Sequence, residues 1–239
     1  MVVAPEWSLF AGIAALVTLT LVTLARASQG VVTEQPAPAP AQERMSPELL
    51  LANVALSQGL LAVVLALGAW YAAIPLAALG LGPDALGAGA VLVGVAVGVA
   101  LYAANEGMAL VAKRVGVGYA EDLRELLAPA SAREWTVLLV AVLPIIAGFE
   151  EFLFRSVLVG AVAAGFGVSP WLLAVGSSVL FGFAHGAQGL GGMLVTGTLG
   201  FILAAAFIAT DSLLVVVVAH YLVNALEFVV HEGLGVEWG

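Results

Sequence analysis

Six polar residues lie within long apolar stretches of the chain: Glu150, Glu151, Arg155, His185, His220 and Asn224. A charge at the centre of a bilayer costs about 2.5–3.5 kcal/mol on insertion scales. Glu151 and Arg155 are spaced i, i+4, so on a helix they share one face and can form an ion pair. Glu150 points about 100° away from Glu151, and no neighbour on its own helix balances its charge. We therefore expect Glu151 and Arg155 to support packing and Glu150 to carry the chemistry.

An unmatched carboxylate in an apolar setting is suited to act as a general base toward water. His185 ends an apolar stretch, and His220 lies in the middle of another, with Asn224 one turn later on the same helical face. A lone His in a membrane helix often serves only as a hydrogen-bonding residue between helices. Two His, one Asn and one unmatched Glu in a single chain favour a shared site.

Several other hydrolase sites are excluded by missing residues. The chain has no Cys, which excludes a thiol nucleophile and a Cys-ligated metal. His231 precedes Glu232, but Gly235 stands where the metalloprotease motif H-E-x-x-H requires its second His. We expect His231 to lie at the membrane interface. No Gly-x-Ser-x-Gly motif is present, and Ser177 and Ser178 are interpreted as helix-packing residues.

The composition shows which elements must position these residues. Of the 239 residues 62% are apolar and 10% are charged, and the net charge is -9. A soluble domain has about 25% charged residues. The composition therefore excludes a soluble globular enzyme, a disordered chain and a nucleic-acid binder, because no basic surface is present to hold phosphates. An integral membrane protein in contact with the lipid bilayer remains.

A membrane helix needs about 20 apolar residues, and the sequence predicts about seven of them. The expected spans are residues 7–25, 49–72, 85–105, 135–163, 170–185, 192–209 and 212–230. A short amphipathic helix over 119–128 is expected to lie on the cytoplasmic surface. The predicted fold class is therefore all-α, a polytopic membrane helical bundle. Gly94 and Gly98, four residues apart, predict a close helix-packing face.

The sequence divides into two parts. Residues 1–47 hold the first span and a Pro/Ala-rich linker, which is expected to be extended and to make the first helix an accessory. Residues 48–239 form the main helical membrane domain. The first span is longer than the apolar core of a signal peptide and lacks a basic start, which favours a retained helix, with cleavage as the alternative.

Basic residues set the expected orientation. Apart from Arg155, every Lys and Arg lies in residues 26–48 or 106–134, two segments separated by two spans. They therefore lie on one side, which the positive-inside rule makes cytoplasmic. We expect the N-terminus outside and the C-terminus in the cytoplasm.

Three motifs in order resemble a known family. Residues 150–155 read E-E-x-x-x-R, residues 181–185 read F-x-x-x-H and residues 220–224 read H-x-x-x-N. On successive membrane helices they resemble the CPBP family, which comprises the type II CAAX prenyl endopeptidases and their bacterial and archaeal relatives, including abortive-infection-type (Abi-like) proteins. The resemblance covers about residues 135–231. The family fold is an all-helical bundle, usually of about eight spans.

The resemblance implies an intramembrane endopeptidase and a role for each matching residue. Glu150 would activate a water, His185 would hold or polarise it, and His220 and Asn224 would stabilise the oxyanion. Glu151 and Arg155 would support the site. The protein would lie in the cell membrane of a prokaryote. Its substrate would be a membrane-associated peptide or protein, which need not be prenylated.

Two questions stay open at the level of sequence. Glu150, His185 and His220 form a set that could bind zinc with one position left for water, while a metal-free glutamate mechanism uses the same residues. The alternative functions are a proton-coupled transporter, since intramembrane Glu, His and Arg also form relays, and a non-catalytic membrane immunity or scaffold protein. The chain lacks the internal repeat typical of many transporters.

Overall fold

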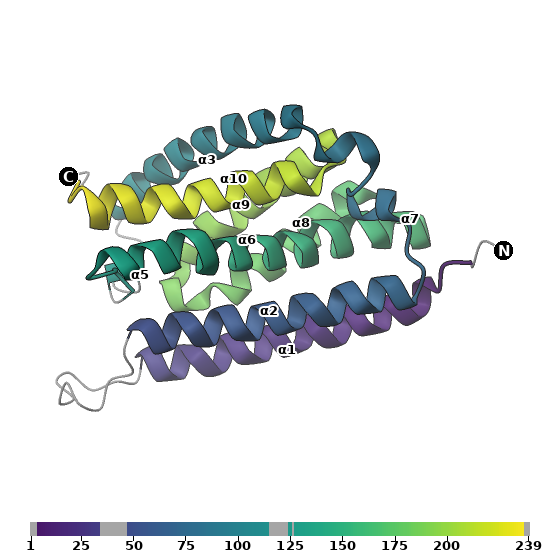
Figure 1. Cartoon of the computed structure of the whole chain (residues 1–239), viewed down its shortest axis with the longest axis horizontal. Coiled ribbons are helices and arrows are strands. Elements are labelled where there is room, and N and C mark those ends of the chain that lie inside the picture. The colour runs from purple at the N-terminus through teal and green to yellow at the C-terminus, as the bar shows by residue number, and fades with distance from the viewer. Residues whose placement is uncertain (1–3, 34–46, 115–123, 126, 237–239) are drawn as a thin grey trace.

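Every element in the described part of the chain is a helix, as the sequence predicts. The computed structural model describes residues 4–33, 47–114, 124–125 and 127–236. The N-terminal part contains α1 (Trp7–Thr33), α2 (Pro47–Tyr71), the short turns η2 (Leu76–Leu79) and η3 (Pro83–Leu86), and α3 (Ala88–Arg114). The first residues of α1 and the end of the last helix lie at opposite ends of the molecule (Figure 1).

The middle of the chain is one long helical rod built from five consecutive pieces. They are α5 (Ala132–Val137), η4 (Leu138–Val142), α6 (Leu143–Glu151), η5 (Phe152–Ala161) and α7 (Val162–Phe166). The C-terminal part comprises α8 (Pro170–Ala184), the turn η6 (Gly186–Gln188), α9 (Gly189–Thr210), α10 (Leu213–Glu227) and η7 (Phe228–Gly233).

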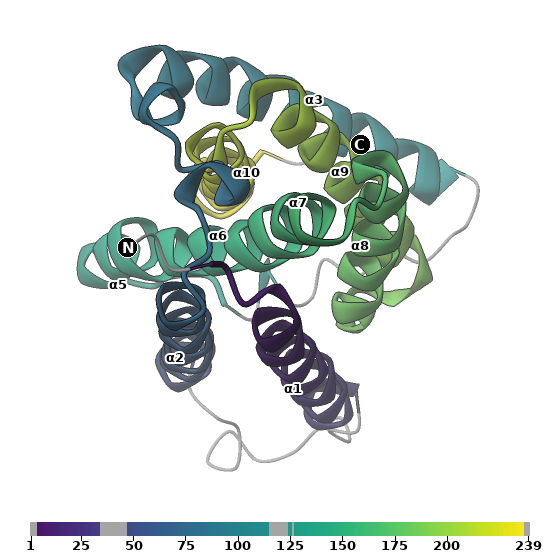
Figure 2. The same ribbon diagram turned by 90° about the vertical axis from the view of Figure 1, so that its right-hand side faces the viewer.

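The rod lies in the middle of the bundle, with the other helices around it. Figure 2 shows α1 and α2 on one side of the rod and α3 and α10 on the other. Phe149, Leu153 and Phe154 of the rod are buried in one apolar cluster with Phe10 of α1 and Leu65 of α2. This central position explains why the rod can carry buried polar side chains: other helices shield them from lipid on several sides.

In the described part of the chain six helices are long and apolar enough to cross a membrane, so the predicted polytopic all-α bundle is confirmed. The remaining expected span, residues 170–185, corresponds to the apolar helix Pro170–Ala184, which is only 15 residues long. The expected third span is longer than predicted, because α3 continues past Glu106 to Arg114. The surface helix expected over 119–128 and the linker over 34–46 lie largely outside the described residues.

Two stretches of the rod, η4 and η5, are π-helical, a feature that no sequence pattern predicted. Hydroxyl groups join the second stretch to its neighbours. Ser177 of α8 donates to the Phe154 carbonyl at 2.7 Å, and Ser156 donates to the Leu79 carbonyl at 2.7 Å. Single π turns inside α-helices are frequent at functional sites, and η5 begins at the residue after Glu151.

The first helix packs into the body of the protein. Phe10, Ala14, Val17 and Leu21 of α1 are buried in the cluster that includes the rod, and α1 also contacts α8 and η6. Whether residues 1–47 act as an accessory to residues 48–239 stays a prediction about function.

Candidate active site

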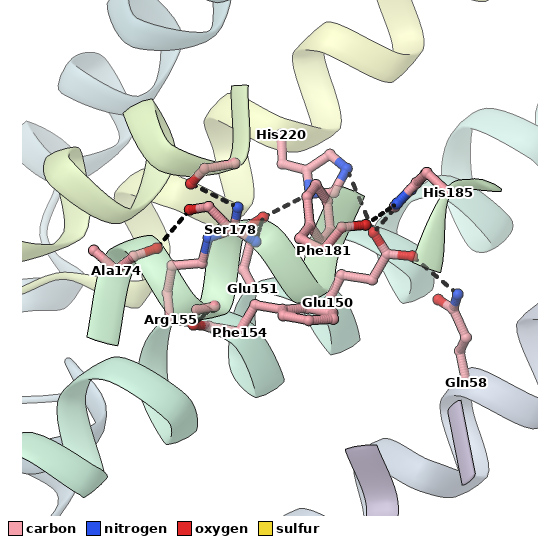
Figure 3. A network of polar contacts seen from close by, with 12 residues as sticks. Gln58, Glu150, Glu151, Phe154, Arg155, Ala174, Ser178, Phe181, His185 and His220 are labelled. Atoms are coloured by element: carbon pink, nitrogen blue, oxygen red, sulfur yellow. Dashed lines mark hydrogen bonds and ion pairs between the residues drawn. The ribbon is translucent and has the colours of Figure 1, made fainter. Parts of the chain in front are cut away.

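Glu150 and Glu151 end α6 and are both removed from the surface. Glu150 is 6% exposed and Glu151 is fully buried. Because they are adjacent on a helix, their side chains enter different surroundings, and Figure 3 shows the two carboxylates with different partners. Each must therefore be considered separately.

Glu151 lies at the centre of a chain of charged and polar contacts. Arg155 contacts its Oε1 at 3.0 Å, as the i, i+4 spacing predicts, and also donates to the Gly200 carbonyl at 3.0 Å. The guanidinium lies 4.5 Å from the centroid of the Phe181 ring. The same Glu151 oxygen is 2.7 Å from Nδ1 of His220. Glu151 thus joins a buried cation to an imidazole.

Glu150 has a neutral partner that sequence reasoning missed. Nε2 of Gln58, on α2, donates to Oε1 of Glu150 at 3.0 Å (Figure 3). Gln58 is one of few polar residues in the uncharged run 49–83, and that rarity was the available signal. Its position 92 residues before Glu150 left no pattern that could connect the two.

The second oxygen of Glu150 faces two imidazoles. Oε2 lies 3.9 Å from Nε2 of His185 and 3.9 Å from Nε2 of His220. Within the described residues this oxygen is buried and has no hydrogen-bond partner. The structure therefore brings together three of the residues selected from the sequence, contributed by α6, by the end of α8 and by α10.

Hydrogen bonds at the far nitrogens fix how the two imidazoles are presented. Nδ1 of His185 lies 2.8 Å from the Phe181 carbonyl, and Nδ1 of His220 lies 2.7 Å from the Glu151 carboxylate. Both partners only accept hydrogen bonds, so each Nδ1 carries a hydrogen. In a neutral ring Nε2 is then unprotonated, and in both residues Nε2 is the nitrogen nearest Glu150.

A cavity of about 270 Å³ adjoins these groups. Its wall includes Glu150, His185, His220 and Asn224, so Asn224 shares the space with the other three. Apolar residues from several helices form much of the remaining wall: Leu101, Leu143, Ile146, Leu199 and Leu203. The cavity thus combines a polar end suited to hydrolysis with an apolar surface suited to a hydrophobic ligand.

Comparison with known proteins gives one result. Residues 132–226 match the family model of type II CAAX prenyl endopeptidase Rce1-like proteins. Over this segment, which is less than half of the chain, the sequence is similar to that family. The matched segment contains all six polar residues selected from the sequence, whereas Gln58 precedes it. No curated protein and no solved structure matches the chain.

Proposed function

We propose that this Rce1-like protein is a membrane-embedded endopeptidase in which Glu150 activates a water molecule. The observation that carries the proposal is the position of Glu150 Oε2, 3.9 Å from each of two imidazole nitrogens at the edge of the cavity. Atoms 3.9 Å apart are too distant for a direct hydrogen bond, but one water can bridge them with hydrogen bonds of about 2.8 Å.

In this proposal Glu150 and His185 hold the attacking water. Oε2 of Glu150 accepts one of its hydrogens and Nε2 of His185 accepts the other, which leaves an oxygen lone pair directed toward the substrate carbonyl. Glu150 takes the first proton as the new C–O bond forms. The same proton then passes to the leaving nitrogen when the C–N bond breaks, which restores the carboxylate.

His220 and Asn224 stabilise the negative charge that develops on the carbonyl oxygen. The Asn224 side-chain amide is a neutral donor on the cavity wall. In this proposal His220 is doubly protonated throughout the reaction, with Nδ1–H on the Glu151 carboxylate and Nε2–H available to the oxyanion, so it donates without taking a proton from the water. Donors preorganised in a low-dielectric site are often the largest single contribution to catalysis.

Zinc is the alternative way to activate the water. Glu150, His185 and His220 would hold the ion, their donor types suit it, and it would supply Lewis-acid activation of water. Among the described residues, these three do not form a group whose ligand atoms all lie within 4.8 Å of one another, so the side chains would have to move closer together to hold an ion. We propose the metal-free mechanism because one water could bridge the separations of 3.9 Å.

The substrate proposed is a peptide segment of a membrane protein or membrane-associated peptide. The apolar cavity wall would receive hydrophobic side chains, and lipid would surround the bundle. The expected orientation, with the C-terminus in the cytoplasm of a prokaryotic cell, would place His185 and η6 toward the cytoplasmic side.

The test is peptide cleavage by the purified chain in proteoliposomes, measured by mass spectrometry on a library of hydrophobic peptides. Glu150→Gln should reduce cleavage by at least about a thousandfold, because it removes the base while keeping the size of the side chain. The matched control is Glu125→Gln, which changes an exposed carboxylate and should leave cleavage intact. Full activity in Glu150→Gln would disprove the assigned base.

The same purified protein is used to distinguish the metal-free mechanism from the zinc mechanism. Activity that persists after dialysis against a chelator, with metal content measured on the same sample, supports the metal-free mechanism. Activity that disappears with the metal and returns when zinc is added to wild type and to His231→Ala contradicts it.

A further inference from the structure

A second polar cluster lies where the C-terminal half of α3 meets the end of α10 and η7. Its members are Glu106, Glu227 and His231, and one ligand atom from each lies within 4.8 Å of the others. Nε2 of His231 is 3.0 Å from Oε1 of Glu106 and 3.8 Å from Oε2 of Glu227. The three side chains are only 11–17% exposed. His231 is therefore part of a polar cluster, and its expected position at the membrane interface stays a prediction.

The orientation of His231 is typical of a metal ligand. Its Nδ1 lies 2.7 Å from the Val236 carbonyl, so this nitrogen carries the hydrogen and Nε2 faces the two carboxylates. Metal-binding His residues usually donate their other ring N–H to a carbonyl or carboxylate, which fixes the ring and the tautomer. Asn105 acts similarly on Glu227, because its Nδ2 donates to Oε1 and Oε2 is the oxygen that faces His231.

Charge balance gives an independent reason to place a cation here. Glu232 and Arg124 complete the network, since Arg124 contacts Glu232 at 2.7 Å and Glu227 at 3.5 Å. Three carboxylates and one guanidinium leave a net charge of -2 among these described residues when His231 is neutral. A divalent cation brings this charge to zero, as would two protons, one on His231 and one on a carboxylate. Uncompensated charge is costly in a poorly hydrated site.

We propose that Glu106, Glu227 and His231 bind one divalent transition-metal ion. Two carboxylate oxygens and one imidazole nitrogen suit Zn²⁺, Co²⁺ or Mn²⁺, whereas Mg²⁺ and Ca²⁺ prefer oxygen ligands alone. The distances of 3.0 and 3.8 Å bracket the separation of about 3.3 Å between neighbouring ligands of tetrahedral zinc. The ion ties α3 to η7.

This site is separate from the one around Glu150 and does not depend on the proposed peptidase function. Its location still relates the two, because Glu227 and Asn105 line the same cavity as Glu150. A bound ion therefore fixes the part of the cavity wall formed by α3 and α10, which run side by side (Figure 1).

The test uses the full chain, purified in detergent, treated with chelator and titrated with Co²⁺ and then Zn²⁺. Wild type should bind about one equivalent at this site, with the visible absorption of tetrahedral Co²⁺. Binding at this site should be lost in His231→Ala and in Glu106→Gln and retained in His185→Ala, the matched change at the other cluster. Bound metal should also raise the melting temperature of wild type but not of His231→Ala.

X-ray absorption on wild type alone keeps the proposal testable if the variants fail to fold. The spectrum should show one imidazole per ion and otherwise oxygen ligands. An ion held by two imidazoles would belong to Glu150, His185 and His220 and would contradict this proposal. A wild type that binds no Co²⁺ or Zn²⁺ would contradict it as well, whatever the outcome for peptidase activity.

Discussion

The two oxygens of the Glu150 carboxylate have different neighbours, and this difference fixes which oxygen faces the imidazoles. Oε1 accepts the amide of Gln58, while Oε2 faces the imidazoles of His185 and His220. A carboxylate free to rotate would spend part of its time away from the water that it is proposed to activate. We therefore propose Gln58 as a positioning residue for Glu150, contributed by a helix outside the matched segment.

Loss of the Gln58 amide should lower turnover more than substrate binding. We expect Gln58→Leu to reduce kcat by about 10–100-fold, the usual effect of removing a group that orients an active-site residue, with KM little changed. The measurement is steady-state cleavage in proteoliposomes. Ser57→Ala, one residue away on α2 and half-buried, is the control. An unchanged kcat in Gln58→Leu would show that Glu150 does not need this contact.

The buried pair of Glu151 and Arg155 should matter for stability first. Arg155→Met removes the cation from the fully buried Glu151 carboxylate and leaves it with the His220 contact, and breaking such a buried pair costs about 3–5 kcal/mol. The double variant Glu151→Leu/Arg155→Met should recover much of that loss, because replacing both charges with apolar side chains is often nearly neutral. Reversible unfolding in detergent measures both. Equal stability of wild type and Arg155→Met would contradict this role.

The spacing of residues along a single helix predicts only part of the candidate site. The i, i+4 pair was predictable because both residues lie on one helix, and the unmatched state of Glu150 followed from the same geometry. The contact with Gln58 and the His231 cluster could not be predicted, since each joins helices distant in the chain. The buried position of His231 depends on how α3 packs, which no single-helix pattern contains.

Helix packing sets how closely the residues of different elements approach, and small residues control it here. A Cβ atom added at Gly98 of α3 would lie 2.9 Å from the Ala219 carbonyl and 2.9 Å from Cβ of Leu222, both on α10. Gly94 meets the same helix at 2.8 Å. The predicted packing face of these two glycines is therefore confirmed, and it lies directly beside His220.

Widening this contact should damage both stability and activity. We expect Gly98→Ala to cost about 1–3 kcal/mol, the usual cost of overpacking, and to reduce cleavage because α10 carries His220 and Asn224. Gly107→Ala on the same helix is the control, since its Cβ would meet nothing within 4 Å. Thermal melting and cleavage are measured on both variants. Equal effects of the two substitutions would contradict the close approach of α3 and α10.

The helices could be predicted from the sequence, but their lengths and internal register could not. Uncharged runs predicted where the long helices lie because lipid excludes charge. The charge of Glu106 predicts an end to the third span, yet α3 continues past it, and His231 on η7 contacts this carboxylate. The π-helical stretches of the rod depend on contacts such as that of Ser177 with Phe154, which only the assembled bundle provides.

The orientation of the whole molecule is a prediction with a direct test. Because the chain has no Cys, single substitutions give clean labelling sites. Ala130→Cys and Ser169→Cys both replace exposed residues and lie at opposite ends of the rod. A membrane-impermeant maleimide applied to intact cells should label Ser169→Cys and leave Ala130→Cys unlabelled until the cells are opened. The reverse pattern would invert the predicted topology.

The short length of α8 has a consequence for how water would reach the proposed hydrolytic site within the membrane. A 15-residue helix is about 22 Å long, well short of the roughly 30 Å of hydrocarbon in a typical bilayer. A span that is too short thins the bilayer around it. Because α8 ends at the residue before His185, thinning at this end of the helix would bring the polar headgroup region toward the imidazole. Water could thus reach the site beside His185 from the membrane surface without a long channel.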